Sequence, residues 1–178
     1  MTGQKAEHRY KECGLSSVYL TNVMVYRCNK CSAVVPEIPA TGVLHRVIAL
    51  RLISKKRQLA GDEIRFLRKL CGYSGTEFAE TLGSSKSFVS RIEKIGCGKQ
   101  IDRTIRLLVI GKLAREIAGQ AEPVLKNVTI EGLIDNAMQA FKQIEGKARS
   151  ERYDVSPEDI EKFSGVPTEN LELAEAVN

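Results

Sequence analysis

Residues 74–96 have the sequence Ser74-Gly-Thr-Glu-Phe-Ala-Glu-Thr-Leu-Gly-Ser-Ser-Lys-Ser-Phe-Val-Ser-Arg-Ile-Glu-Lys-Ile-Gly96, and this stretch decides the fold. Its residue types fit two short helices that pack at a steep angle across a turn of three or four residues. Ala79 is small where the second helix crosses the first, Gly83 can take the left-handed conformation that ends the first helix, and Ser85 can cap the second. The apolar side chains expected to anchor both helices are Phe78, Leu82, Val89 and Ile92. The spacing therefore predicts a helix-turn-helix.

The outward face of the second helix distinguishes this motif from an ordinary helical hairpin. It carries short hydroxyl donors and long cations, which suit base edges and phosphates in a DNA major groove. Phe88 is large for an outward position, so it either meets a thymine methyl group or packs at the rim. The residues of this helix predicted to contact double-stranded DNA are Ser85, Lys86, Ser87, Phe88, Ser90, Arg91 and Lys94.

The flanking sequence predicts a mainly α protein with a small N-terminal β segment. Residues 17–21 and 22–27 are β-like runs that precede a Cys-x2-Cys turn. Residues 42–58 form a predicted helix, in which the run from Lys55 to Arg57 lies at the C-terminus and complements the helix dipole. Residues 62–118 are predicted to be helical with short Gly/Ser breaks.

The C-terminal part of the sequence predicts two more helices. Apolar residues at three-and-four spacing predict a helix over 130–144 that Thr129 can cap, and its apolar stripe serves as core or as a subunit contact. Ser156 can cap a last short helix, which Gly165 and Pro167 end. The expected organisation is therefore a zinc-knuckle-like segment at 1–41, a helix-turn-helix domain with flanking helices at 42–118, and an acidic helical extension at 119–178 for dimerisation or partner binding.

Charge is divided unevenly between the two ends of the chain. Residues 1–118 carry 21 Lys and Arg against 10 Asp and Glu, whereas residues 119–178 carry 6 against 12. A basic front part suits a polyanion such as DNA. No apolar run is long enough to span a membrane, and the N-terminus lacks the apolar stretch of a signal peptide. We therefore expect a cytoplasmic protein with no membrane partner.

Five cysteines, an odd number, argue against a disulfide framework in such a protein. Cys28-Asn-Lys-Cys31 is a zinc-knuckle turn, because two thiolates two residues apart can face one tetrahedral ion. The other knuckle has only Cys13, since Tyr10 stands where its first cysteine would be. The predicted zinc ligands are Cys13, Cys28, Cys31 and His8, with His45 as a weaker choice for the fourth. Reduced, partly buried thiols are the alternative, and we expect Cys71 and Cys97 to be packing residues of that kind.

Two resemblances extend these predictions. Gly61-Asp-Glu-Ile-Arg-Phe-Leu-Arg-Lys-Leu-Cys-Gly-Tyr-Ser-Gly-Thr-Glu-Phe-Ala-Glu-Thr-Leu-Gly83, followed by Phe88-Val-Ser-Arg-Ile-Glu93, resembles the lambda-repressor-like (Xre-type) helix-turn-helix. The resemblance implies a structural ion pair between Arg68 and Glu93, and a phosphate contact at Thr76.

The order of segments over about residues 10–96 resembles the MqsA/YgiT-type zinc-finger antitoxin family. The features that carry it are the knuckle, then Ile38-Pro39, then Leu44-His45-Arg46 and the block that begins at Glu63. The resemblance implies that the zinc region binds a partner toxin and that the helix-turn-helix, as a dimer, represses the family's own operon. This chain departs from the pattern in the missing zinc cysteine and in the long segment that follows the helix-turn-helix.

The sequence thus favours a sequence-specific repressor that binds double-stranded DNA as a homodimer on a palindromic operator of its own operon. The family resemblance implies the additional role of antitoxin in a toxin-antitoxin pair. The alternative is a protein-interaction antitoxin that neutralises a toxin without specific DNA binding. A redox sensor that uses Cys13, Cys28 and Cys31 is a further hypothesis. The sequence contains no phosphate-cradling glycine loop and no histidine in a triad or H-E-x-x-H context, so we do not expect an enzyme.

Overall fold

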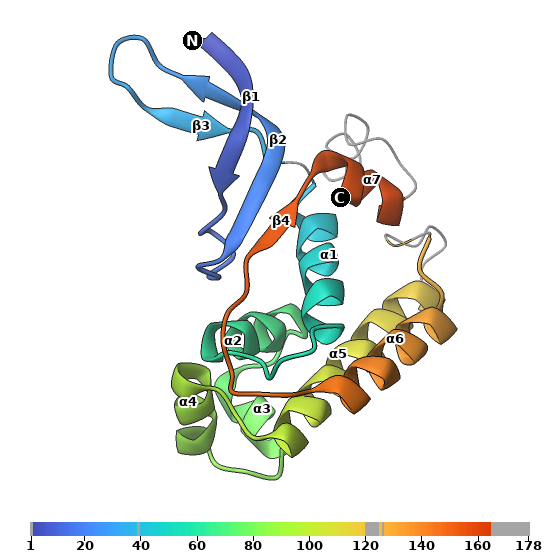
Figure 1. Cartoon of the computed structure of the whole chain (residues 1–178). Helices are drawn as coiled ribbons and strands as arrows, with labels where there is room; N and C mark the ends of the chain where they lie inside the picture. Colours follow the sequence, from blue (N-terminus) through green and yellow to red (C-terminus); the bar gives the residue numbers. More distant parts are fainter. Residues whose placement is uncertain (1, 39, 120–124, 126, 165–178) are drawn as a thin grey trace.

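The computed structural model describes residues 2–38, 40–119, 125 and 127–164, which form a small sheet and a larger set of helices (Figure 1). The elements are, in chain order, β1 (Thr2–Arg9), β2 (Val18–Arg27), β3 (Val34–Pro36), α1 (Thr41–Ile53), α2 (Gly61–Leu70), α3 (Gly75–Thr81), α4 (Lys86–Ile95), α5 (Lys99–Gly119), α6 (Ile130–Gln143), β4 (Tyr153–Val155) and α7 (Pro157–Ser164). The predicted fold class, mainly α with a small N-terminal β segment, is confirmed. Gly165, Pro167 and the rest of the acidic end lie outside the described residues.

Strand β2 is the centre of the sheet. It pairs with β1 along most of its length in antiparallel register, with β3 at one end and with β4, in parallel, at the other. The two predicted β-like runs form this single strand. Asn22, the first residue of the second run, has a φ of 61°, and the pairing with β1 slips there by one residue, between Ala6 and His8. This irregularity is a β-bulge, which bends the strand without ending it. The sequence did not predict β1, whose side chains are mostly exposed and polar.

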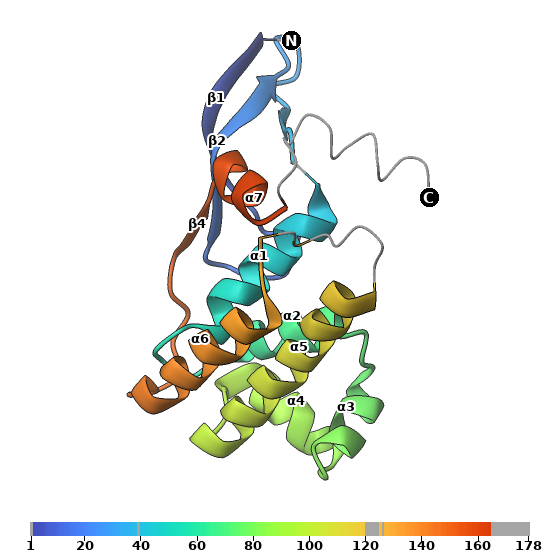
Figure 2. The same cartoon turned by 90° about the vertical axis from the view of Figure 1, so that its right-hand side faces the viewer.

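Helix α1 lies between the sheet and the other helices (Figures 1 and 2). It contacts α2, α5, α6 and α7, so most of its side chains are buried. Its polar face is therefore narrower than that of an amphipathic surface helix. Its buried residues are Val43, Leu44, Val47, Ile48, Ala49, Leu50, Leu52 and Ile53. On the sheet side, the Tyr10 hydroxyl lies 3.0 Å from His45 Nε2, which fixes the loop after β1 against α1.

The C-terminus of α1 corrects one prediction. The helix ends at Ile53, five residues before the predicted end at 58, and Lys55 is buried instead of serving as an exposed charge cap. Lys55 Nζ lies 2.9 and 2.8 Å from the two carboxylate oxygens of Glu63, which is also buried. The chain leaves the helix here because the favourable partner of Lys55 lies inside the protein, at the start of α2.

Glu63 joins the end of α1 and the start of α2 to the distant strand β4. Its carboxylate accepts hydrogen bonds from Lys55, from the Ala60 amide at 2.7 Å and from the Tyr153 hydroxyl at 3.1 Å. Burial raises the pKa of Glu63, whereas Lys55 and the other donors lower it. Lys55 also donates to the Arg149 carbonyl at 2.5 Å. The network therefore ties the C-terminal segment 149–153 to the start of α2.

A second buried ion pair holds the connection between α1 and α2. Arg106 of α5 lies 2.7 Å from Asp102 and donates to the carbonyls of Ile53, Lys55 and Arg57. The other oxygen of Asp102 accepts from the Leu59 amide at 2.6 Å. Arg106 and Asp102 are both fully buried, so each relies on these partners to offset the cost of losing water.

Residues 127–164 pack against the rest of the described protein. Helix α6 runs alongside α5 (Figure 2), β4 joins the N-terminal sheet, and α7 contacts α1 and β2. Thr129 and Ser156 cap their helices as predicted, because their hydroxyls accept from the Gly132 and Asp159 amides. The three predicted segments thus share one hydrophobic core. No helix in the described part of the chain is both long enough and apolar enough to cross a membrane.

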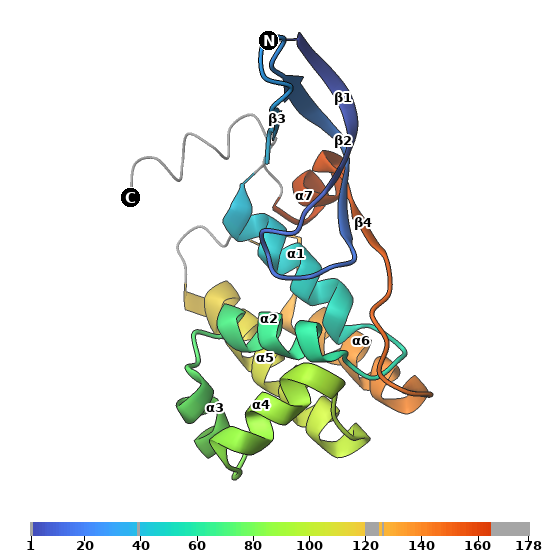
Figure 3. The same cartoon turned by 90° about the vertical axis from the view of Figure 1, so that its left-hand side faces the viewer.

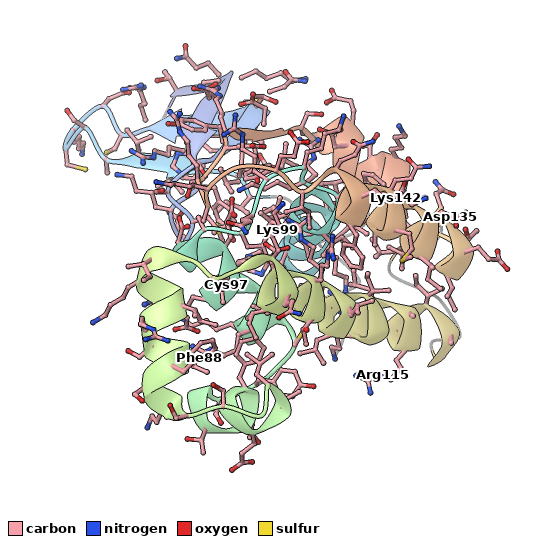
Figure 4. All side chains as sticks on the ribbon, turned by 60° about the horizontal axis from the view of Figure 1, so that its bottom comes forward. Phe88, Cys97, Lys99, Arg115, Asp135 and Lys142 are labelled. Carbon is pink, nitrogen blue, oxygen red and sulfur yellow. The ribbon has the colours of Figure 1, made fainter. Side chains whose placement is uncertain are left out.

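The buried pair at Arg106 generates a stability prediction. Arg106→Met should lower the free energy of unfolding by about 3–5 kcal/mol, because it leaves a buried carboxylate and three carbonyls without their donor. Arg115 lies on the exposed side of the same helix (Figure 4), so Arg115→Met should change stability by less than about 0.5 kcal/mol. Urea unfolding at pH 7 measures both, and equal midpoints for the two variants would contradict the role given to Arg106.

Candidate nucleic-acid interface

Local signals in residues 74–88 build the two short helices α3 and α4. Ser74 begins α3 with a capping box: its hydroxyl accepts from the Glu77 amide at 3.2 Å, and its own amide donates to Glu77 Oε2 at 2.8 Å. Gly83 has a φ of 59°, the left-handed conformation predicted for the end of α3. Ser85 then caps α4 by accepting from the Phe88 amide at 3.2 Å. The predicted turn chemistry is confirmed.

The inner faces of the two helices are anchored in the core. Phe78, Ala79, Val89 and Ile92 are each at most 3% exposed, and Leu82 packs against them at the edge. These are the residues predicted to hold the helix-turn-helix together. The orientation of α4 is therefore set by its apolar side, which leaves its other side to solvent.

Glu93 fixes the C-terminal half of α4 to α2. Its carboxylate lies 2.5 Å from Arg68 Nε and 3.2 Å from Arg65 Nε, so the pair with Arg68 that the Xre resemblance implies is present. Burial alone would raise the pKa of Glu93, but the two arginines outweigh it and lower the pKa. Arg68 also donates to the Tyr73 carbonyl at 2.8 Å. The carboxylate therefore serves the structure and is not available to face DNA.

Gly61 permits the close approach of α2 and α4. A Cβ atom at this position would lie 2.6 Å from the Glu93 carbonyl oxygen and 2.8 Å from the carbonyl carbon of Lys94. Both are backbone atoms at the end of α4, so neither can move aside as a flexible side chain could. No signal in the sequence marks this position, because the contact joins residues that are far apart in the chain.

The structure brings the predicted DNA-contacting residues to one end of the molecule, opposite the sheet (Figures 1 and 3). Thr76 is exposed at the start of α3, and all but one of the predicted α4 residues are exposed. The exposed set is Ser85, Lys86, Ser87, Ser90, Arg91 and Lys94. Positions 86, 87, 90, 91 and 94 recur at the spacing of one helical face. A band of hydroxyl and cationic groups therefore runs along the outer side of α4.

Phe88 is the exception in this set. It is half-buried, packs against the core and lies on the side of α4 that faces the rest of the molecule (Figure 4). The guanidinium of Arg91 lies 5.3 Å from the centre of its ring, within the range of a cation–π contact. Of the two sequence-based interpretations of Phe88, the structure thus matches packing at the rim, where the ring supports Arg91.

The predicted zinc ligands lie at two different ends of β2. Cys28 and Cys31 lie in the turn after β2, where the amides of Lys30 and Cys31 and the Cys31 thiol lower the pKa of the Cys28 thiol. Cys13 lies in the loop before β2, and its thiol donates to the Tyr10 carbonyl at 3.3 Å. A strand rises about 3.3 Å per residue, so the length of β2 separates the two groups by roughly 30 Å. Cys13 cannot share one ion with Cys28 and Cys31 in this arrangement.

The histidines do not complete a metal site. His8 Nε2 lies 3.9 Å from Glu12 Oε1 at the Cys13 end of β2, and His45 Nε2 contacts the Tyr10 hydroxyl. Among the described residues, no group of three or more His, Cys, Asp or Glu could hold a metal ion. The predicted grouping of Cys13, Cys28, Cys31 and His8 is thus not found, because Asn22 bends β2 without folding it back. A zinc ion on the two knuckle thiols would need its other ligands from a second molecule or from outside the described residues.

Cys71 and Cys97 are packing residues, as predicted. Both are half-buried against the core, and burial raises the pKa of Cys71 to about 11 and that of Cys97 to about 12. Both groups are therefore neutral thiols near pH 7.

Comparisons with known proteins return no relative: no family model, curated protein or solved structure matches this chain.

The contact at Gly61 generates a prediction with an internal control. Gly61→Ala should lower the free energy of unfolding by about 1–3 kcal/mol, since the added methyl group meets backbone that must shift. Gly75 is the first residue of α3, and a Cβ atom there would have nothing within 4 Å. Gly75→Ala should therefore leave stability unchanged or raise it by up to about 1 kcal/mol. Chemical denaturation of both variants provides the measurement, and a Gly61→Ala protein as stable as Gly75→Ala would show that α2 and α4 do not meet this closely.

Proposed function

We propose that this protein is a sequence-specific repressor that binds double-stranded DNA through α4. One observation carries the proposal: the apolar side of α4 is locked in the core, while its opposite side presents Lys86, Ser87, Ser90, Arg91 and Lys94 to solvent. A helix presented in this way by a preceding short helix is the arrangement that enters a major groove.

The side chains on α4 divide into two chemical roles. Arg91 can donate two parallel hydrogen bonds to the O6 and N7 atoms of a guanine, and its contact with Phe88 limits the conformations it must give up on binding. Ser87 and Ser90 are short donors and acceptors that suit several base edges. Lys86, together with Thr76 at the start of α3, suits phosphate oxygens. When such a protein is bound at a promoter, it represses transcription by occluding the promoter.

The proposed repressor binds DNA as a homodimer, because one recognition helix contacts few base pairs. A two-fold pair of these helices doubles the interface on a palindrome. Helix α6 supplies a suitable surface. Ile130, Ile134 and Met138 are 37%, 46% and 50% exposed and lie at intervals of one turn. A two-fold axis through Ile134 places Ile130 of each copy opposite Met138 of the other, so the stripe complements itself.

The proposal predicts the behaviour of two α4 variants. Arg91→Ala should weaken binding to the preferred duplex by roughly 5- to 150-fold and relax specificity at one base pair. Lys86→Ala should weaken binding to all duplexes alike, because a phosphate contact carries no sequence information. Neither should alter thermal unfolding, since both side chains are exposed.

Selection from a random duplex pool supplies the preferred sequence, and fluorescence anisotropy then measures affinity. The proposal expects two half-sites about 10 base pairs apart, or a multiple of that spacing. Selection that enriches no sequence, or normal binding by both variants, would contradict it.

The α6 stripe generates a separate prediction about assembly. Ile134→Lys should convert the dimer to monomers, because it places two like charges on the two-fold axis. Gln139→Lys adds the same charge on the exposed polar side of α6 and should leave the dimer intact. Sedimentation equilibrium distinguishes the two, and a wild-type protein that is monomeric at micromolar concentration would remove the dimer from the proposal.

A second candidate function, toxin neutralisation without specific DNA binding, is favoured by the far end of the sheet. Val34 and Val35 are exposed there on the short edge strand β3, next to the Cys28–Cys31 turn. An exposed apolar edge suits addition of a partner strand. Salt-sensitive, sequence-selective binding to DNA would exclude an antitoxin whose helix-turn-helix no longer binds DNA.

A further inference from the structure

The segment between α6 and β4 passes the C-terminal end of α4 on its way back to the sheet (Figure 1). Backbone and side-chain hydrogen bonds hold it in place. The Glu145 amide donates to the Lys56 carbonyl at 3.0 Å, and the Ser150 hydroxyl donates to Asp62 Oδ1 at 3.1 Å. The Arg149 carbonyl accepts from the buried Lys55. The segment is thus a fixed part of the helix-turn-helix surroundings.

Contact between this segment and α4 is direct. Gly96, which ends α4 with a φ of 86°, is so close to Ala148 that a Cβ atom at Gly96 would lie 2.6 Å from the Cβ atom of Ala148. A shallow hollow beside this contact is lined by Lys94 and Ile95 of α4 and by Arg149 and Ser150. Residues from the acidic C-terminal part of the chain therefore adjoin the proposed DNA-binding helix.

The cationic side chains beside this hollow are available to bind a polyanion. Lys147 and Arg149 are exposed, as is Lys94, and none of the three forms an ion pair within the described residues. Nearby Glu93 and Glu151 are paired with arginines, so they do not neutralise this group. Asp62, which lines the same hollow and accepts hydrogen bonds from the Ser16 and Ser150 hydroxyls, leaves one negative charge against the three cations. Net positive charge therefore accumulates at the C-terminal end of α4.

We propose that Lys147 and Arg149 form a second phosphate-binding element, which extends the α4 interface along the DNA backbone. Thr76 and Lys86 lie near the N-terminal end of α4, and these two cations lie near its C-terminal end. A helix in a major groove has phosphate backbone on either side of it, so contacts at both of its ends fix its position along the groove. This inference rests on the proposed function and adds a partner surface to it.

The test is a salt titration of the full-length protein on its selected duplex and on a scrambled duplex. Each phosphate contact contributes about 0.9 to the slope of log affinity against log salt. The double variant Lys147→Ala/Arg149→Ala should reduce that slope by about 1–2 and weaken binding to both duplexes to a similar degree. The matched control is Arg27→Ala/Lys30→Ala, which removes the same charge from the end of β2 and the exposed turn that follows it, at the far end of the sheet.

The outcomes separate this inference from the function on which it rests. A wild-type slope in the Lys147/Arg149 variant, with binding still sensitive to Arg91→Ala, overturns the inference alone. An equal loss in the control variant also overturns it, since overall charge would then explain the effect. Wild-type protein that shows no salt-sensitive binding overturns the proposed function as well. Thermal unfolding of both double variants should match wild type, because all four side chains are exposed.

Discussion

The buried ion pair between Lys55 and Glu63 is the constraint on which the remaining structure depends. It places the end of α1, the start of α2 and the segment around Tyr153 at one point, where all three contribute hydrogen bonds. Such pairs add little net stability, because desolvation offsets most of the attraction between the charges. Their effect here is on arrangement: any other register of these segments would leave a charge buried without its partner. Arg106 and Asp102 extend the same constraint to α5 through the α1–α2 connection.

Direct contacts that lead from this buried ion pair through α2 determine the position of α4. The start of α2 is fixed by Glu63, Gly61 in its first turn lies against the backbone of Glu93, and Arg68 further along the helix pairs with the Glu93 carboxylate. The core residues Val89 and Ile92 then set the rotation of α4 about its own axis. The hydroxyl and cationic side of α4 is consequently outward because packing, ion pairing and close backbone approach all hold its opposite side. A surface held in this way loses little freedom when it binds, which favours specific recognition.

The sequence predicted those parts of the structure whose causes are local. Ser74, Gly83 and Ser85 act within a few residues of themselves, so the helix-turn-helix could be placed with its caps and its core positions. The sequence does not predict the burial of Lys55, because this burial depends on how the end of α1 packs against Glu63 and against the distant residues Arg149 and Tyr153. Strand β1 has no apolar alternation, and β4 is too short to show any. The zinc ligands could not be grouped by spacing alone, because their separation depends on whether Asn22 turns the chain or only bends it.

The role of α4 is best measured by a nuclear magnetic resonance titration of the labelled protein with its selected duplex. If α4 is the DNA-binding element, the amide signals of Ser87, Ser90 and Arg91 should shift or broaden on addition of DNA. Signals from Cys28 to Val35, at the far end of the sheet, should remain where they are. Changes confined to the sheet, or no change at DNA concentrations well above those of the protein, would rule out α4 as the DNA-binding element.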